Sequence, residues 1–248
     1  MSTFSIVTSV NQSIVDSKHQ HVIDSTLKHC KEVDFYVCNE NSFLDENANI
    51  DGAINIDLFE AIPDLKDFLE QSEFKNCHKI GKQDTEKYLN NPNEYLSTNH
   101  YWNRNSIFWF RKMCSVFIAA QKCKSDLLIW LDSDVLVRKP IDKRFTDFVS
   151  KHDVCSILRK NFSGWMFTDT GIVCYNLKAA GKHFVNAFYE IFRSGEAFKQ
   201  YRWDDCYIFD LLVEMNKDKL SCCGLNTIFG APLNYEEYFF HDKGHRSG

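Results

Sequence analysis

The chain has 248 residues, of which 44% are hydrophobic and 15% aromatic, enough for the core of one large domain. Its formal net charge is −5 and its isoelectric point is about 6.0, with lysines and arginines scattered along the sequence. These values exclude a strongly basic nucleic-acid-binding protein, and no apolar run approaches the roughly 20 residues of a membrane span.

The first part of the chain predicts alternating strands and helices. Residues 4–10 form an apolar run typical of a buried strand, and residues 16–31 have helical character. Further strands are expected at 33–38 and, more weakly, at 53–58. Strand, helix and strand at this spacing indicate a parallel α/β unit.

The middle of the chain predicts helices around a long polar stretch. Residues 63–72 and 106–123 are expected to be helical. Residues 75–105 are rich in Asn, Lys and Glu with little apolar periodicity, which indicates a long loop or small helical excursion. The rest of the chain predicts helices at 142–150, 177–194 and 203–216, strands at 127–131, 154–158, 171–175 and 220–223, and an irregular tail.

The ten cysteines include no Cys-x-x-Cys pair, which argues against a zinc site or a disulfide framework. Cys38, Cys114, Cys155 and Cys174 fall inside predicted strands or helices, where a free cysteine acts as a small hydrophobic residue. Together with an N-terminus that lacks a signal-peptide pattern, this predicts a protein of the reducing cytoplasm.

Asp132-Ser133-Asp134 is the strongest functional signal in the sequence. It follows the apolar run 127–131, so two carboxylates lie where a buried strand reaches the surface. Their charges need a positive partner, and a divalent cation that also holds phosphate oxygens would meet that need. Carboxyl ends of strands are where ligands of α/β sheets bind. The alternative is a turn in which one aspartate caps the next element.

This pair is one of six motifs that follow one another along the chain. In order they are Thr8-Ser9-Val10-Asn11, Arg111-Lys112, Asp132-Ser133-Asp134, Thr168-Asp169-Thr170-Gly171-Ile172, Trp203-Asp204-Asp205 and His241-Asp242-Lys243-Gly244. Over nearly the whole chain this arrangement resembles GT-A fold glycosyltransferases that use nucleotide-sugar donors. The glycogenin-like and galactosyltransferase-like group is the closest in pattern, and some cytosolic viral glycosyltransferases are similar.

The resemblance implies an α/β protein: a single GT-A (Rossmann-like) domain over residues 1–248, with a mostly parallel central sheet flanked by helices. Residues 1–138 would be the nucleotide-binding half and residues 139–248 the acceptor and sugar half. The implied enzyme is a metal-dependent hexosyl- or pentosyltransferase that moves a sugar from a nucleoside-diphosphate sugar to a hydroxyl of a glycan or protein. The expected donor is a UDP-sugar. Its place would be the cytoplasm, or the host cytoplasm for a viral protein.

In such families the Asp-x-Asp pair holds Mn²⁺ or Mg²⁺, which bridges the two phosphates of the donor. The resemblance implies that Asp134 is a metal ligand and that Asp132, with Ser133 beside it, contacts the metal, the ribose or both. His241 would complete the metal shell. An imidazole with carboxylates suits Mn²⁺ better than Ca²⁺.

The nucleotide is expected to lie at the ends of the first two strands. Thr8, Ser9, Val10 and Asn11 would offer hydroxyls and backbone amides to the base and ribose, and Asn39 would meet the base edge. Ordinary turn chemistry is the alternative for both.

The cation that binds the diphosphate stays open at this point. The family often has His-x-x-Gly-x-x-Lys, whereas here Ser247 stands at the last position. The candidates near Gly244 are Lys243, His245 and Arg246, and on the preceding helix Arg111 or Lys112. The last two point in different directions on a helix, so only one is expected to reach the site.

Asp204, Asp205 and Asp169 are the candidates for the catalytic carboxylate. One of the first two would act as a base on the acceptor hydroxyl, or would position the sugar in a retaining enzyme. Asp169 is a second candidate, because Gly171 allows close backbone approach. For Asp204 and Asp205 the alternative is capping of the helix that they open.

Two other classes of protein remain possible from the sequence. An apolar strand followed by Asp-x-Asp also resembles haloacid-dehalogenase-type phosphatases, in which Asp132 would be the nucleophile with Mg²⁺. A non-catalytic sugar-binding relative would keep the fold without the reaction. The donor sugar, the acceptor, the stereochemistry and the oligomeric state do not follow from the sequence.

Overall fold

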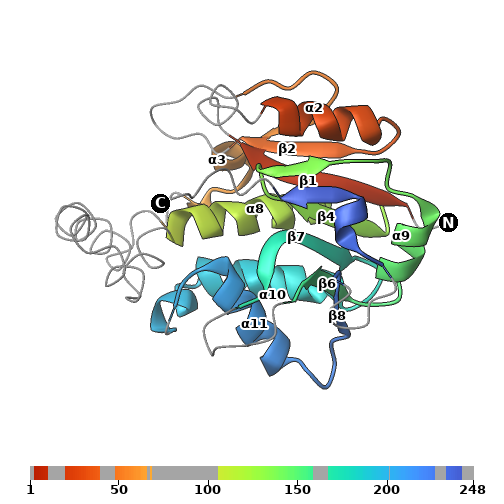
Figure 1. The fold of residues 1–248 in the computed structure, drawn as a ribbon. Coiled ribbons are helices and arrows are strands. Elements are labelled where there is room, and N and C mark those ends of the chain that lie inside the picture. The colour runs from red at the N-terminus through yellow and green to blue at the C-terminus, as the bar shows by residue number, and fades with distance from the viewer. Residues whose placement is uncertain are drawn as a thin grey trace, which may run out of the picture.

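The computed structural model describes residues 3–10, 20–39, 48–65, 68, 106–158, 167–200, 202–226 and 233–241. They form an α/β fold around a seven-stranded sheet with the order β3-β2-β1-β4-β7-β6-β8 (Figure 1). The strands are β1 (Phe4–Val10), β2 (Phe35–Asn39), β3 (Ile54–Asp57), β4 (Leu127–Leu131), β6 (Val154–Ile157), β7 (Asp169–Asn176) and β8 (Cys222–Gly224).

The central sheet is mostly parallel, as predicted. Only β7 runs against its neighbours, pairing antiparallel with β4 and β6, while the other neighbouring strands pair in parallel. A second, two-stranded antiparallel sheet joins β5 (Val135–Val137) to β9 (Phe239–His241).

Helices cover both faces of the sheet. They are α2 (Gln20–His29), α3 (Leu58–Ala61), α8 (Ser106–Lys122), α9 (Lys143–Val149), α10 (Gly181–Arg193) and α11 (Asp205–Met215), with short 3₁₀ helices η2 (Glu196–Lys199) and η4 (Tyr235–Glu237). None of the described helices is both long and apolar enough to cross a membrane.

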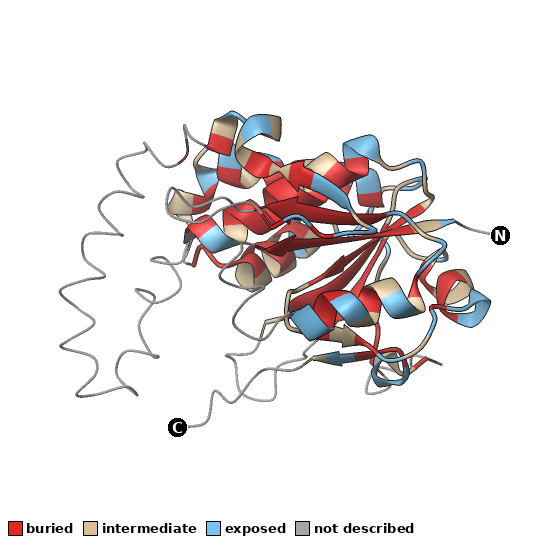
Figure 2. Cartoon of the chain, turned by 90° about the horizontal axis from the view of Figure 1, so that it is seen from above, coloured by how far each residue is buried: buried red, intermediate tan, exposed pale blue. Residues whose placement is uncertain are grey.

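Two hydrophobic clusters, one for each face, hold these layers together. On one face, Phe110, Phe188 and Phe209 of α8, α10 and α11 pack with alternate residues of the strands. On the other, Ile23 of α2 and Phe145 of α9 pack with the intervening ones. Because the central strands are buried from both sides, they read as continuous apolar runs, and Figure 2 shows them between helices with exposed outer surfaces.

The observed elements follow the predicted ones, with shifts at their ends. The strand at 4–10 and the long helix α8 lie where they were expected. The helix predicted from residue 177 begins only at Gly181, because Asn176 and Asp153 accept hydrogen bonds from the amides of Lys178 and Ala180 and hold a turn.

Two regions of the chain differ from the prediction. Asp57 ends β3 and caps α3 by accepting from the amides of Phe59 and Glu60, so a helix begins earlier than the predicted start at residue 63. The tail is not irregular throughout, since β9 pairs with β5. A strand of only three residues has no periodicity to detect, and its partner lies about a hundred residues earlier in the chain.

The nine cysteines within the described residues are free. Cys38, Cys114, Cys155 and Cys174 are buried in the two clusters, where they pack as small hydrophobic side chains.

Candidate active site

Polar side chains gather at one edge of the central sheet. The parallel strands β1, β2 and β4 end there, at Val10, Asn39 and Leu131. Because β7 runs the opposite way, it begins at this edge with Asp169, and the amide of Asp132 donates to the carbonyl of Gly171 at 2.8 Å. Segments distant in sequence therefore meet at the position where α/β sheets bind ligands.

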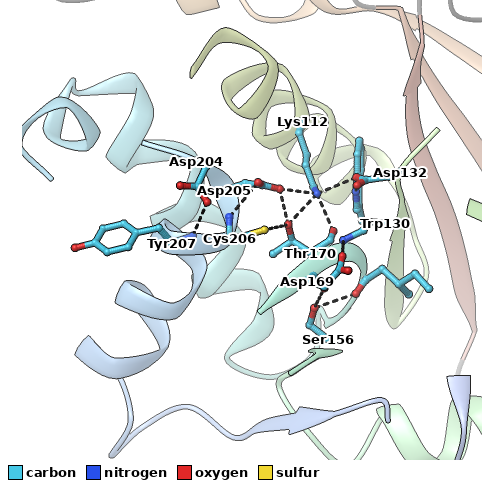
Figure 3. A network of polar contacts seen from close by, with 12 residues as sticks. Lys112, Trp130, Asp132, Ser156, Asp169, Thr170, Asp204, Asp205, Cys206 and Tyr207 are labelled. Carbon is cyan, nitrogen blue, oxygen red and sulfur yellow. Dashed lines mark hydrogen bonds and ion pairs between the residues drawn. The ribbon is translucent and has the colours of Figure 1, made fainter. Parts of the chain in front are cut away.

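Lys112 lies at the centre of this edge (Figure 3). From α8 its Nζ reaches Asp132 Oδ1 at 2.9 Å, Asp205 Oδ2 at 2.6 Å and the carbonyl of Thr170 at 2.7 Å. Its side chain is only 6% exposed. Burial alone would lower the pKa of Lys112, but the two carboxylates outweigh it and raise the pKa, so the lysine is charged.

Two further donors fix the carboxylates around Lys112. The indole Nε1 of Trp130 donates to Asp132 Oδ1 at 2.6 Å, and the hydroxyl of Thr170 donates to Asp205 Oδ2 at 2.5 Å. Both contacts use oxygens that Lys112 already meets, which leaves Asp132 Oδ2 outside these bonds. Burial, together with the charges of Asp205 and Asp134, raises the pKa of Asp132 although Lys112 opposes this.

Asp132, Asp134 and His241 form a group that could hold a metal ion. Their ligand atoms all lie within 4.8 Å of one another. Asp134 Oδ1 is buried and makes an ion-pair contact of 3.1 Å with His241 Nε2. Neighbouring ligands of an octahedral ion bound at about 2.1 Å are about 3 Å apart, so the distance between Asp134 and His241 fits two ligands of one cation.

The β5–β9 pair brings His241 to this group. Val135, the residue after Asp134, pairs with His241 in the antiparallel ladder. Burial opposes protonation of the imidazole, but the contact with Asp134 and the charges of Asp134 and Asp169 outweigh it and raise the pKa of His241. A divalent cation held by these carboxylates would take the place of that proton, because a ligating imidazole is neutral. The donor set of two carboxylates and one imidazole suits Mn²⁺.

Asp204 and Asp205 have different surroundings, although both were candidates for catalysis. Asp204 is 1% exposed, pairs with Arg202 at 2.6 Å through Oδ1, and caps α11 by accepting from the amide of Tyr207 through Oδ2. This is the alternative that the sequence left open for it. Only Asp205 faces Lys112 and the site edge.

A second close group, Asp204, Asp205 and Cys206, does not fit a metal ion. The carboxylates are already paired with Arg202 and Lys112. Burial raises the pKa of the Cys206 thiol well above its ordinary value, which disfavours the thiolate that a metal needs.

The strand ends predicted to hold the nucleotide belong to β1 and β2, and β1 also pairs with β4, the strand that leads to Asp132. Val10, at the end of β1, pairs with Asn39 at the end of β2. Thr8 Oγ1 and Asn39 Oδ1 are buried without a hydrogen-bonding partner among the described residues. Such atoms carry a desolvation cost that a bound ligand can relieve.

The remaining predicted residues are placed as follows. Ser9 is buried near the end of β1, and Ser133 lies in the turn that the amide of Val135 closes onto the carbonyl of Asp132. Arg111 is buried on α8. Its neighbour Lys112 contacts the Asp-x-Asp pair through the carboxylate of Asp132. Asn11, Lys243, Gly244, Arg246 and the segment 75–105 lie outside the described residues.

Trp130 and Thr170 contact the carboxylates of the site but were not predicted as site residues. Trp130 precedes Asp132 by two residues, and the alternation of a strand places both side chains on one side. The contact between them could therefore have been predicted from the sequence. The contact of Thr170 with Asp205 joins β7 to α11 and has no local signature.

No protein-family model matches the chain, and no curated protein matches it. Solved structures with a similar course of the chain are glycosyltransferases. Mouse xyloside xylosyltransferase 1 is 11% identical, with a TM-score of 0.49 over 91% of this chain and 86% of that one. The galactosyltransferase LgtC is 13% identical, with a TM-score of 0.46 over 90% and 73%. A glycosyltransferase involved in the glycosylation of the major capsid of PBCV-1 is 14% identical, with a TM-score of 0.43 over 98% and 96%.

The chain spans less than half, 45%, of the length of the glycosyltransferase GlyE of Streptococcus pneumoniae TIGR4, to which it is 10% identical with a TM-score of 0.46. All of these TM-scores lie below 0.5. The likenesses therefore establish no shared activity, and function has to be inferred from the residues of the site.

Proposed function

We propose that this protein is a metal-dependent glycosyltransferase that moves a sugar from a nucleoside-diphosphate sugar to a hydroxyl of a glycan or protein. The observation that carries the proposal is the meeting of Asp132, Asp134 and His241 at the strand ends, next to the carboxylate of Asp205. A site for a cation, beside buried polar atoms that lack partners, fits a donor with two phosphates and a nucleoside.

The donor would lie across this edge of the sheet. Asn39 and Thr8 have the unpartnered atoms that could meet a base and a ribose, and UDP is the nucleotide we propose. Asp134 and His241, with the second oxygen of Asp132, would hold Mn²⁺. When bound, the ion would neutralise the charge that grows on the leaving diphosphate.

Asp205 and Asp169 would flank the transferred sugar. Asp205 is held by Lys112 and Thr170 through Oδ2 and by the amide of Cys206 through Oδ1, so it is better suited to positioning than to moving a proton. Asp169 is held through Oδ1 by the amide of Gly171 at 3.0 Å. Its Oδ2 is turned towards His241, 3.8 Å from Nδ1.

We place the acceptor in a cavity next to His241. The cavity measures about 330 Å³, within the range of small-ligand sites. Its lining offers aromatic surface together with charged groups, as recognition of a sugar requires; the residues are Arg138, Asp169, Tyr235, Glu236, Phe239, Phe240 and His241. In this proposal residues 1–138 and 139–248 form one domain, whose second half supplies the acceptor side and one metal ligand.

No observation within the described residues favours the phosphatase alternative. We therefore propose only the transferase function.

The test is slow hydrolysis of nucleotide sugars by the purified protein with Mn²⁺. We expect one donor of a panel of UDP- and GDP-sugars to be hydrolysed, and Asp134→Ala to abolish this. The control is Asp147→Ala on α9, an exposed aspartate paired with Lys143 away from the site. Hydrolysis of no donor, or equal rates for Asp134→Ala and the control, would contradict the proposal.

A further inference from the structure

Gly171 lies against the imidazole of His241. A Cβ atom built on Gly171 would fall 2.5 Å from His241 Cε1 and 3.0 Å from Nδ1. Contacts under about 3 Å between such carbon atoms are far inside van der Waals range. The ring of His241 therefore occupies the space that any other residue at position 171 would fill.

The backbone of Gly171 gives no other reason for a glycine. Its φ is not among the positive values, which belong to Gly52 and Gly195 in the described part of the chain. Alanine would be acceptable to the strand itself, so the requirement comes from the neighbouring ring.

Gly171 also fixes the residue on the other side of the imidazole. Its amide donates to Asp169 Oδ1, and the Cβ of an alanine would lie 3.1 Å from that same oxygen. This bond leaves Asp169 Oδ2 facing His241 Nδ1. One residue thus borders both the ring and the carboxylate beside it.

The imidazole cannot move aside without leaving the metal group. The ladder between β5 and β9 fixes the backbone of His241 opposite Val135. Rotation of the side chain is the movement that remains, and it would carry Nε2 away from Asp134 Oδ1, 3.1 Å distant.

We propose that Gly171 is a positioning residue that seats His241 as a metal ligand, an inference that rests on the proposed metal site. Groups that orient metal ligands typically contribute 10- to 100-fold in metal affinity. Gly171→Ala should therefore weaken Mn²⁺ binding by about 10-fold or more, without Gly171 touching the ion.

Mn²⁺ alone is the probe, and its binding is measured from the loss of the paramagnetic resonance signal of the free ion. The variants are Gly171→Ala, His241→Ala and the double variant. Ile172→Val, a buried neighbour on β7, is the control for a small loss of core packing. We expect Gly171→Ala to lose affinity in the wild-type background, no further loss when His241 is already alanine, and unchanged affinity in Ile172→Val.

Melting temperatures without metal test the steric part separately. Gly171→Ala should lower the melting temperature by about 3 °C or more, and His241→Ala should relieve most of that loss. Wild-type affinity in Gly171→Ala, or equal losses in both backgrounds, would overturn the inference. Wild-type protein that binds no Mn²⁺ would overturn the metal site of the proposed function, and the inference with it.

Discussion

At the scale of single residues, the charge balance around Lys112 governs the site. One buried ammonium group faces the carboxylates of Asp132 and Asp205, so the cluster keeps an excess of negative charge. Asp134 adds to that excess. A divalent cation next to this cluster would be attracted to it, and the lysine prevents the two held carboxylates from repelling each other.

Lys112→Met should be strongly destabilising, because it leaves two carboxylates without their cation. Removing one partner of a buried ion pair typically costs about 3–5 kcal/mol in the free energy of unfolding. The control is Lys217→Met. That lysine is exposed and pairs with exposed Glu214, so its loss should cause no measurable change. Urea unfolding measures both, and equal stability of the two variants would refute the role of Lys112.

Part of the candidate site could be predicted from the sequence. Asp132 and Asp134 were found because an apolar run places them at a strand end, and Lys112 because it lies on a helix that leads there. Asp204 could not be separated from Asp205, since both open the same helix. Only the path of the chain shows that one meets Arg202 and the other Lys112.

At the scale of elements, the segment from η4 to β9 supplies His241, the third residue of the metal group. Tyr238 is fully buried against Phe145 of α9, with ring centres 5.0 Å apart, and its hydroxyl donates to Asp142 at 2.8 Å. The amide of Arg138 donates to the carbonyl of Tyr238 at 2.7 Å. These contacts lie outside the metal group but hold the strand that carries His241.

Tyr238→Phe should therefore loosen β9 specifically. Loss of a hydrogen bond to a charged group costs about 1.5–3 kcal/mol in the free energy of unfolding. The matched control is Tyr189→Phe, which removes a 2.9 Å hydrogen bond to Asp64 on the other face of the sheet. Amide hydrogen exchange should accelerate in β9 only in Tyr238→Phe; the same exchange pattern in both variants would argue against a local role.

Asp142 should give the stability of this region an acid dependence. Burial opposes ionisation, but the hydrogen bonds from Tyr238 and the amide of Phe145, with the charge of Lys139, together outweigh it and lower the pKa of Asp142. Its contribution is therefore present above the unfolded pKa of about 3.9 and is lost as pH falls through the lower folded value.

Asp142→Asn keeps a capping residue on α9 but removes the charge. It should be less stable than the wild type at pH 7, and the difference should shrink towards pH 3. Urea unfolding at both pH values measures this. A difference in stability between wild type and Asp142→Asn that grew from pH 7 to pH 3 would contradict this prediction.

The elements show where sequence patterns stop being informative. The strand β1 was predicted because burial on both faces leaves a continuous apolar run, and the helix α8 because burial leaves apolar residues at helical spacing. The strand β9 was not predicted, because its structure depends on pairing with β5 and on the burial of Tyr238.

At the scale of the whole molecule, the reversed strand β7 is what completes the site. It brings Asp169, Thr170 and Gly171 to the edge where β1, β2 and β4 end. The sequence indicated a mostly parallel sheet, but the direction of a single strand could not be read from its composition.

The most direct measurement of the central claim is the melting temperature of the protein with UDP, Mn²⁺ or both. A ligand that binds the folded state at 100 times its Kd stabilises it by about 2.7 kcal/mol. We expect UDP and Mn²⁺ together to raise the melting temperature, and Asp134→Ala to remove the effect. If no nucleoside diphosphate stabilises the wild-type protein in the presence of Mn²⁺, the account of this site as a nucleotide-sugar and metal site is contradicted.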